Sequence, residues 1–272
     1  MDNVRSRLRD AKRIVIKVGT STLTYSTGKI NLTTIDKLSR VISDLVNQGR
    51  EIILVTSGAI GVGTSKLKMK EKPKRIRERQ AVAAVGQCEL MHIYSKFFSE
   101  YGHIVGQILL TSTVVNDKVG RRNVINTFNT LLAKEIIPIV NANDSVSVEE
   151  IKAGQINTFL ENDTLAAIVS KLTGADLMII LSDVNGFYDS DPKENPNAKF
   201  ISTIYEITPE IENCAGGAGT KRGTGGMITR LKAAKIATSA GVDMVVANGS
   251  DPHIIMDIVN GNEVGTIFVA RK

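Results

Sequence analysis

Short runs rich in β-branched and aliphatic residues alternate with longer stretches of helical periodicity along this chain, and this alternation limits the possible folds more than any other feature. The runs with the length and composition of strands are residues 13–18, 51–56, 104–111, 136–141, 176–182, 242–248 and 266–270. Strands that alternate with helices are typical of a mainly parallel sheet covered on both faces, because each crossover lays a helix on the sheet. The sequence therefore predicts an α/β protein with right-handed crossovers.

The stretch between the first two strand candidates shows the helical half of this pattern. Apolar residues recur at the spacing of one helix face over residues 32–46, with Thr33 or Thr34 able to cap the helix and Gly49 able to end it. Residues 186–203 break the rhythm with two prolines and several Asn and Asp residues, which predicts a long loop or a small excursion. Because 272 residues with 42% apolar content can bury a sizeable core, we expect one domain over residues 1–272.

Composition excludes several classes of function. The 34 basic and 28 acidic residues give a formal charge of +6, which suits anionic ligands, while 4% aromatic residues and no Trp offer little surface for stacking nucleic-acid bases. We therefore expect no nucleic-acid partner. The apolar runs are strand-sized, so we expect neither a signal peptide nor a membrane-spanning helix. Cys88 and Cys214 match neither a zinc spacing nor a disulfide framework, which favours the cytoplasm.

Lys17 is the first residue whose place in the pattern needs a chemical reason. It lies among apolar neighbours in the strand candidate 13–18, just before Gly19, where an ammonium group without a partner would be costly to desolvate. A lysine at the end of a buried strand that faces a phosphate avoids this cost, which predicts a point charge for nucleotide phosphates. The alternative is a lysine that extends to solvent at the edge of the sheet.

A glycine-rich turn follows the second strand candidate, over residues 57–63. Backbone N–H groups at such a turn, where a helix begins, bind carboxylates or phosphates. The turn is not a Walker loop, because Thr64 stands where that loop requires lysine, and it is not a dinucleotide fingerprint, because Lys66 stands where the third glycine would fall. A purely structural tight turn is the alternative.

Acidic and polar side chains follow two further strand candidates at the same predicted edge of the sheet. Asp144 follows one strand, and Ser182 and Asp183 end another. Because open α/β sheets bind ligands at the carboxyl ends of their strands, we expect these side chains to converge. Asn162 and Asp163 precede an apolar helix between them, so Asp163 is either a ligand contact or the cap of that helix.

A second glycine-rich segment, residues 223–230, leads into another helix and offers flexible backbone and the cation of Arg230, unless it is only a surface loop. The three histidines, His92, His103 and His253, are too few and too scattered for a Ser-His-Asp triad or a histidine metal site. These features suit phosphoryl transfer, which depends on positioning and charge neutralisation more than on proton shuttling. A carboxylate acceptor, with an unperturbed pKa of about 4.3 for glutamate, also needs no general base.

The motifs KVGTS, VTSGAIGVG, NAND, ENDTLAA, LSDVNGFYDSDP and GTGGMITRLKAA occur in this order, and through them nearly the whole chain resembles the amino acid kinase family. The resemblance implies a three-layer α/β/α sandwich, ATP and Mg²⁺ as cofactors, and phosphorylation of the γ-carboxylate of L-glutamate to glutamate 5-phosphate, the first step of proline biosynthesis. It also implies a cytoplasmic homo-oligomer and the hypothesis that the labile product is handed over to glutamate 5-phosphate reductase. The alternatives are a kinase for acetylglutamate, aspartate or carbamate, and a non-catalytic amino-acid sensor on the same fold.

The resemblance also implies a role for each motif residue. Lys17 contacts the transferring phosphates, Asp163 orients the basic groups, and Arg230 neutralises charge on the transferring group. Glutamate is held by Ser57, Asp144 and Asn162. The nucleotide side of the cleft consists of Lys17, Ser182, Asp183, Thr224, Gly225, Gly226, Met227, Ile228, Thr229 and Arg230.

Three features depart from the family pattern. Arg230 stands where the pattern usually has lysine, residues 153–160 make a longer stretch than the usual turn before the Asn-Asp pair, and we expect no C-terminal RNA-binding-like domain beside the kinase domain of residues 1–272. Residues 66–79 also carry eight basic and two acidic residues. We expect this segment to be a solvated face, with nucleic-acid contact as the alternative.

Overall fold

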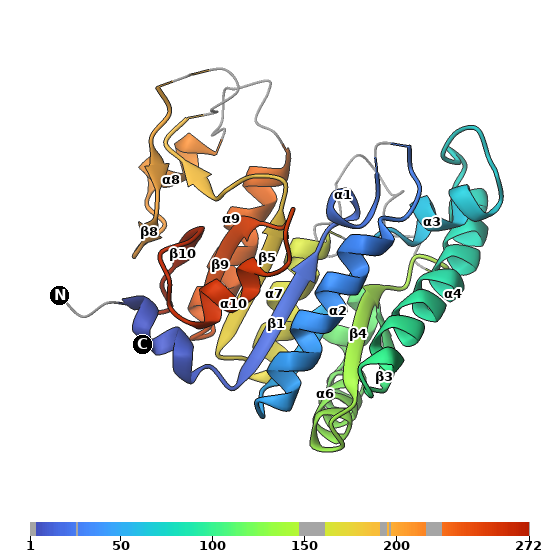
Figure 1. Ribbon diagram of the computed structural model, residues 1–272. Helices are drawn as coiled ribbons and strands as arrows, with labels where there is room; N and C mark the ends of the chain where they lie inside the picture. The colour runs from blue at the N-terminus through green and yellow to red at the C-terminus, as the bar shows by residue number, and fades with distance from the viewer. Residues whose placement is uncertain are drawn as a thin grey trace.

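The computed structural model describes residues 4–25, 27–146, 161–190, 195, 197–215 and 225–271. Its middle layer is a mainly parallel sheet of eight strands (Figure 1), in the order β3-β4-β2-β1-β5-β9-β10-β8. The strands are β1 (Arg13–Val18), β2 (Glu51–Val55), β3 (Val105–Leu110), β4 (Ile137–Ala142), β5 (Leu177–Ser182), β8 (Thr203–Ile204), β9 (Asp243–Asn248) and β10 (Thr266–Phe268). Neighbouring strands are parallel except for the antiparallel pair β9 and β10.

The sheet changes direction of growth at its centre. On one side of β1 lie β2, β4 and β3, in this spatial order, and on the other side lie β5 and β9. The carboxyl ends of β1 and β5 therefore flank a topological switch point, with Lys17 beside Ile180 in the register of the two strands. Open α/β sheets bind ligands in the crevice at such a point, so a ligand-binding site is expected at this edge of the sheet.

Helices cover both faces of the sheet (Figure 1). One face carries η1 (Val4–Asp10), α1 (Thr20–Leu23), α2 (Leu32–Asn47), α3 (Ala59–Lys66), α4 (Ile76–Glu100) and α10 (Ile254–Val259). The other carries α5 (Ser112–Asn116), α6 (Lys118–Ala133), α7 (Asn162–Thr173), α8 (Pro209–Cys214) and α9 (Gly225–Ser239). Along β1, Ile14 and Ile16 pack into the first layer and Val15 into the second, as the two-residue period of a strand requires. The fold is the expected three-layer α/β/α sandwich.

All seven predicted strands are confirmed, to within a few residues at their ends. The predicted cap of α2 is wrong: the side chain of Asn31, and not Thr33 or Thr34, accepts a hydrogen bond of 3.1 Å from the N–H of Thr34. Gly49, with φ of +85°, follows the end of this helix as expected, because glycine adopts the left-handed conformation without strain.

The stretch of residues 186–203 is a small excursion from the sheet. Strands β6 (Phe187–Tyr188) and β7 (Phe200–Ile201) pair antiparallel within it, although residues 191–194 and 196 lie outside the described residues. The two cysteines are free thiols, Cys88 exposed and Cys214 half-buried. Among the described residues no helix combines the length and the apolar character that crossing a bilayer demands.

Candidate functional site

Lys17 and Asp163 form an ion pair at the carboxyl end of β1. Lys17 shares the strand face of Val15 and therefore points toward α7, where its Nζ lies 2.7 Å from Oδ1 of Asp163. The side chains are only 14% and 9% exposed, so each charge offsets the desolvation cost of the other. Lys17 does not extend to solvent at the sheet edge. Asp163 is not the helix cap either, because Glu161 holds that position of α7.

Two consecutive residues of α9 link this pair to the end of β5. Thr229 Oγ1 donates to Oδ2 of Asp163 at 3.4 Å, and Nη2 of Arg230 donates to Oδ1 of Asp183 at the same distance. Helix α9 begins at Gly225, earlier than predicted, so the residues of the motif from Gly226 onward lie in its first turns. Thr224 lies outside the described residues. The described part of the glycine-rich segment, residues 225–230, is thus the start of a helix that reaches both acids.

The end of β5 is shaped by Ser182. Its Oγ donates to Oδ1 of Asp183 at 3.1 Å and accepts a bond of 3.3 Å from the N–H of Val184. Asp183 is 62% exposed and Arg230 only 14%, so their ion pair is weak and a more highly charged phosphate can replace Asp183 as the partner of Arg230. Ser182, Asp183 and Arg230 therefore lie together, as predicted for the nucleotide side.

The glycine-rich turn after β2 packs directly on Thr20, the first residue of α1. Gly58 has φ of +98° at the start of α3, and a Cβ there would lie 3.3 Å from Oγ1 of Thr20. Ser57 is buried, with its Oγ 3.1 Å from Thr20 Oγ1 and donating to the carbonyl of Val18 at 3.4 Å. The N-cap residue of α3 is Gly58, which has no side chain to cap the helix, and N–H groups at such a helix start can bind an anionic ligand.

Asp144 and Asn162 come from elements that adjoin this turn. Asp144 lies in the turn after β4, which pairs with β2, and Asn162 is the first residue of α7, which packs against both strands. Both residues are half-buried, and Oδ1 of Asn162 has no hydrogen-bond partner within the described ranges. Ser57 and Asp144 therefore lie at the same edge of the sheet, on the β2 and β4 side of Lys17, and Asn162 directly precedes the Asp163 that pairs with Lys17.

Thr20 and Glu161 belong to this region but were not predicted from the sequence. The signal for Thr20 was a hydroxyl directly after Gly19, at the end of a buried strand. Burial raises the pKa of Glu161, and the neighbouring charge of Asp163 raises it further while Lys232 opposes the shift. The only sequence signal for Glu161 was its position directly before Asn162 and Asp163.

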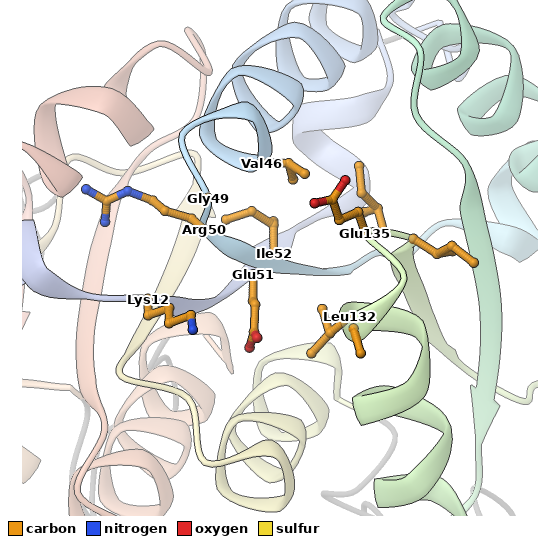
Figure 2. Close-up of a pocket in the computed structure, with 11 residues that line it drawn as sticks. Lys12, Val46, Gly49, Arg50, Glu51, Ile52, Leu132 and Glu135 are labelled. Carbon is orange, nitrogen blue, oxygen red and sulfur yellow. The ribbon is translucent and has the colours of Figure 1, made fainter.

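A pocket of about 220 Å³ lies at the opposite edge of the sheet (Figure 2). Lys12 precedes β1, Glu51 begins β2 and Ile137 begins β4, so the pocket is at the amino ends of these strands. Glu51 is already held by Arg13 at 2.6 Å. This pocket is separate from the residues around Lys17.

Comparisons with known proteins identify the family of this chain. Residues 12–248 match the model of the amino acid kinase family. The chain is 61% identical to the glutamate 5-kinase of Clostridium perfringens over 99% of both chains. It is 55% identical to that of Listeria innocua, over 99% of this chain and 97% of the relative, and 53% identical to that of Clostridium tetani over 99% of both.

Solved structures share the fold at low identity. The T. acidophilum isopentenyl phosphate kinase product complex matches with a TM-score of 0.63 and 18% identity, over 94% of this chain and 99% of that one. The UMP kinase from Ureaplasma parvum matches with a TM-score of 0.64 and 17% identity, over 95% and 99%. At this identity the likeness shows the three-layer architecture alone.

Proposed function

Because this chain belongs to the amino acid kinase family, we propose that it transfers the γ-phosphoryl group of ATP to the γ-carboxylate of L-glutamate, giving glutamate 5-phosphate and ADP. The observation that carries the proposal is the identity of 53–61% to proteins named glutamate 5-kinase over at least 97% of each chain. This reaction is the first step of proline biosynthesis. The motifs that surround Lys17 are of the kind that this chemistry needs.

The transfer requires positive charge where the phosphoryl group passes from one oxygen to the other. A glutamate carboxylate oxygen forms the new bond to the γ-phosphorus, the bond to the β–γ bridging oxygen breaks, and ADP leaves with the electron pair. Lys17, held by Asp163 at 2.7 Å, neutralises charge on the transferring group, and Arg230 does so from the α9 side. No general base is assigned, because the acceptor carboxylate is already ionised.

We assign the acceptor to the β2 and β4 side of Lys17. The N–H groups at the start of α3, next to Ser57, receive a carboxylate. Asp144 and Asn162 provide oxygen acceptors for the α-ammonium group of a free amino acid. The half-buried setting of these two residues strengthens such a charge-assisted bond relative to the same bond in water.

We assign ATP to the other side of Lys17, where the end of β5, with Ser182 and Asp183, adjoins the start of α9, residues 225–230. Thr224, which directly precedes α9 in the sequence, is assigned to the same side. Mg²⁺ is usually bound in kinases by one or two carboxylates together with phosphate oxygens. Asp163 and Asp183 are carboxylates of this kind, and no group of three or more acidic, His or Cys side chains forms a dedicated metal site within the described ranges. Mg²⁺ bound with ATP would supply further charge neutralisation.

Other acceptors of the family, namely acetylglutamate, aspartate and carbamate, are the alternatives within the fold. A non-catalytic sensor is disfavoured, because a sensor has no need of a buried lysine, two acids and a cation at the start of α9. We further propose one amino acid kinase domain over the whole chain, a homo-oligomer in the cytoplasm, and hand-over of the labile product to glutamate 5-phosphate reductase.

A substrate panel tests the proposal. The protein is incubated with ATP, Mg²⁺ and each of L-glutamate, N-acetylglutamate, L-aspartate and carbamate, and ADP release is measured. We expect glutamate to give the highest kcat/KM. A higher value for any other acid, or ADP release that no acid stimulates, would overturn the proposal.

A further inference from the structure

Helix α4 supports the substrate side of the site from behind. Its Gly86 packs so closely on α3 that a Cβ there would lie 1.8 Å from the carbonyl oxygen of Ala59. The hydroxyl of Tyr94 lies 2.9 Å from Oγ1 of Thr56, at the end of β2. Both contacts are buried, so α4 fixes the position of the glycine-rich turn and of the strand before it.

A third contact of α4 reaches the end of β4. Oε1 of Gln87 accepts a hydrogen bond of 2.9 Å from Nδ2 of Asn141, and Oδ1 of Asn141 accepts a bond of 2.9 Å from the N–H of Ala142. Asn141 is 2% exposed and Gln87 is 8% exposed. The amide of Asn141 thus uses one end to bind α4 and the other to shape the backbone that leads to Asp144.

Removal of Gln87 would disturb this arrangement in a predictable way. The buried Nδ2 donor of Asn141 would lose its partner, and an unsatisfied buried donor costs more than the bond itself contributes. The side chain would turn toward another acceptor and release the N–H of Ala142. The turn that follows β4 would then lose its shape.

We propose that Gln87 is a positioning residue for the acceptor substrate, acting through Asn141 on the turn that carries Asp144. The inference rests on the proposed function in one respect, namely that Asp144 binds the acceptor. The hydrogen bond of Gln87 ends on Asn141 and not on that turn, so through this bond Gln87 acts on the acceptor by way of Asn141. The nucleotide side lies where the end of β5 adjoins the start of α9, on the other side of Lys17, so we expect it not to depend on this bond.

Gln87→Met tests the proposal, because methionine keeps the volume and removes the hydrogen bond. We expect the KM of the acceptor to rise roughly ten- to a hundredfold, the cost of a misplaced binding group, with the KM of ATP unchanged within about threefold. Gln87→Glu keeps an oxygen for Asn141, so its acceptor KM should lie closer to that of the parent. Cys88→Ser, at the exposed neighbour of Gln87, should leave both KM values unchanged.

A double-mutant cycle separates positioning from general stability. Asn141→Leu should raise the acceptor KM at least as much as Gln87→Met does, because it also removes the bond to the N–H of Ala142. The double variant should be no worse than the more affected single variant, because both changes break the bond between Gln87 and Asn141. The double variant leaves neither polar group without a partner, so it also serves if Gln87→Met does not fold. Phe98→Leu, which weakens the buried packing of α4 away from the strand ends, should lower the melting temperature without raising the acceptor KM.

The inference is overturned if folded Gln87→Met has the parent's acceptor KM, if the KM of ATP rises equally, or if the two single effects multiply in the double variant. The acceptor in these assays is the acid that the parent uses best. If that acid is not glutamate, the proposed function fails, and the role of Gln87 is still decided by the KM of the acid used.

Discussion

The side-chain ammonium group of Lys17 lies 2.7 Å from the carboxylate of Asp163, and both side chains are largely buried. The carboxylate lets a cation remain at the end of a buried strand, because an unpaired ammonium group there would be costly to desolvate. Lys17 is thereby fixed in position before any ligand binds. A charge that is already in place requires no reorganisation when the transition state forms, which is the condition for strong electrostatic catalysis.

Lys17→Ala should lower kcat by about 10²-fold or more, the usual cost of losing a group that stabilises transition-state charge. It should also lower the melting temperature, because Asp163 keeps a buried charge without its cation. Lys17→Ala combined with Asp163→Asn should recover stability and not activity. Lys37→Ala, at an exposed lysine on α2, serves as the control. Activity of folded Lys17→Ala within a few-fold of the parent would remove Lys17 from the site.

Arg230→Lys should keep part of the activity and Arg230→Ala very little, because the charge near Asp183 matters more than the shape of the guanidinium group. The measurement is kcat at saturating ATP and acceptor. Lys235 lies on α9, as Arg230 does, and forms an exposed ion pair with Glu212 of α8. Lys235→Ala, which breaks this pair, should behave as the parent. Equal rates for Arg230→Ala and the parent would show that another residue, such as Lys221 or Lys232, supplies the charge.

Glu161 should make folding less favourable as the pH rises. Burial raises its pKa in the folded protein, so between the ordinary and the raised pKa the unfolded chain loses its proton first and the free energy of unfolding falls. Glu161→Gln removes this loss. Urea unfolding between about pH 4 and 7 should show the variant gaining stability relative to the parent as the pH rises. Glu100→Gln, at the exposed end of α4, is the reference, and a difference that does not grow with pH would contradict the prediction.

Arg5 should be a strong determinant of stability. It is 4% exposed, and its guanidinium donates to the carbonyls of Val264, Ser202 and Gly265 at 2.7, 2.8 and 2.9 Å. Arg5→Met removes this donor from all three carbonyls, of which that of Ser202 keeps a second partner, the N–H of Ile267 at 3.0 Å, so the free energy of unfolding should fall by about 3 kcal/mol or more. Arg9→Met, which removes an exposed bond to one carbonyl, should cost far less. Similar losses for the two variants in urea unfolding would refute this assignment.

Strand-length runs of β-branched residues were enough to predict the main strands of the sheet, because burial on both faces leaves a signal in each run. The two-residue strands β6, β7 and β8 were missed, because two residues cannot display a period. The predicted N-cap of α2 was wrong because Thr33 and Thr34 are also capping residue types, although Asn31 is an equally good one.

The site could be predicted where a charged residue stands among apolar neighbours in the sequence. Lys17 was identified because a charge in an apolar strand needs a partner, but the sequence could not decide whether Asp163 was a cap or a ligand. Their ion pair depends on how α7 packs against β1, which no local pattern records. The bonds from Thr20 to Ser57 and from Gln87 to Asn141 were missed for the same reason.

Trapping the product tests directly whether L-glutamate is the acceptor. The protein is incubated with ATP, Mg²⁺ and hydroxylamine, which converts an acyl phosphate into a stable hydroxamate. L-Glutamate should give the γ-hydroxamate, and aspartate, shorter by one methylene group, should give much less. N-Acetylglutamate should be a poor acceptor, because a neutral amide facing Asp144 is a mismatch worth about 2–5 kcal/mol if that carboxylate is desolvated. A preference for acetylglutamate or carbamate, or no hydroxamate from any acid while ATP still binds, would contradict the account.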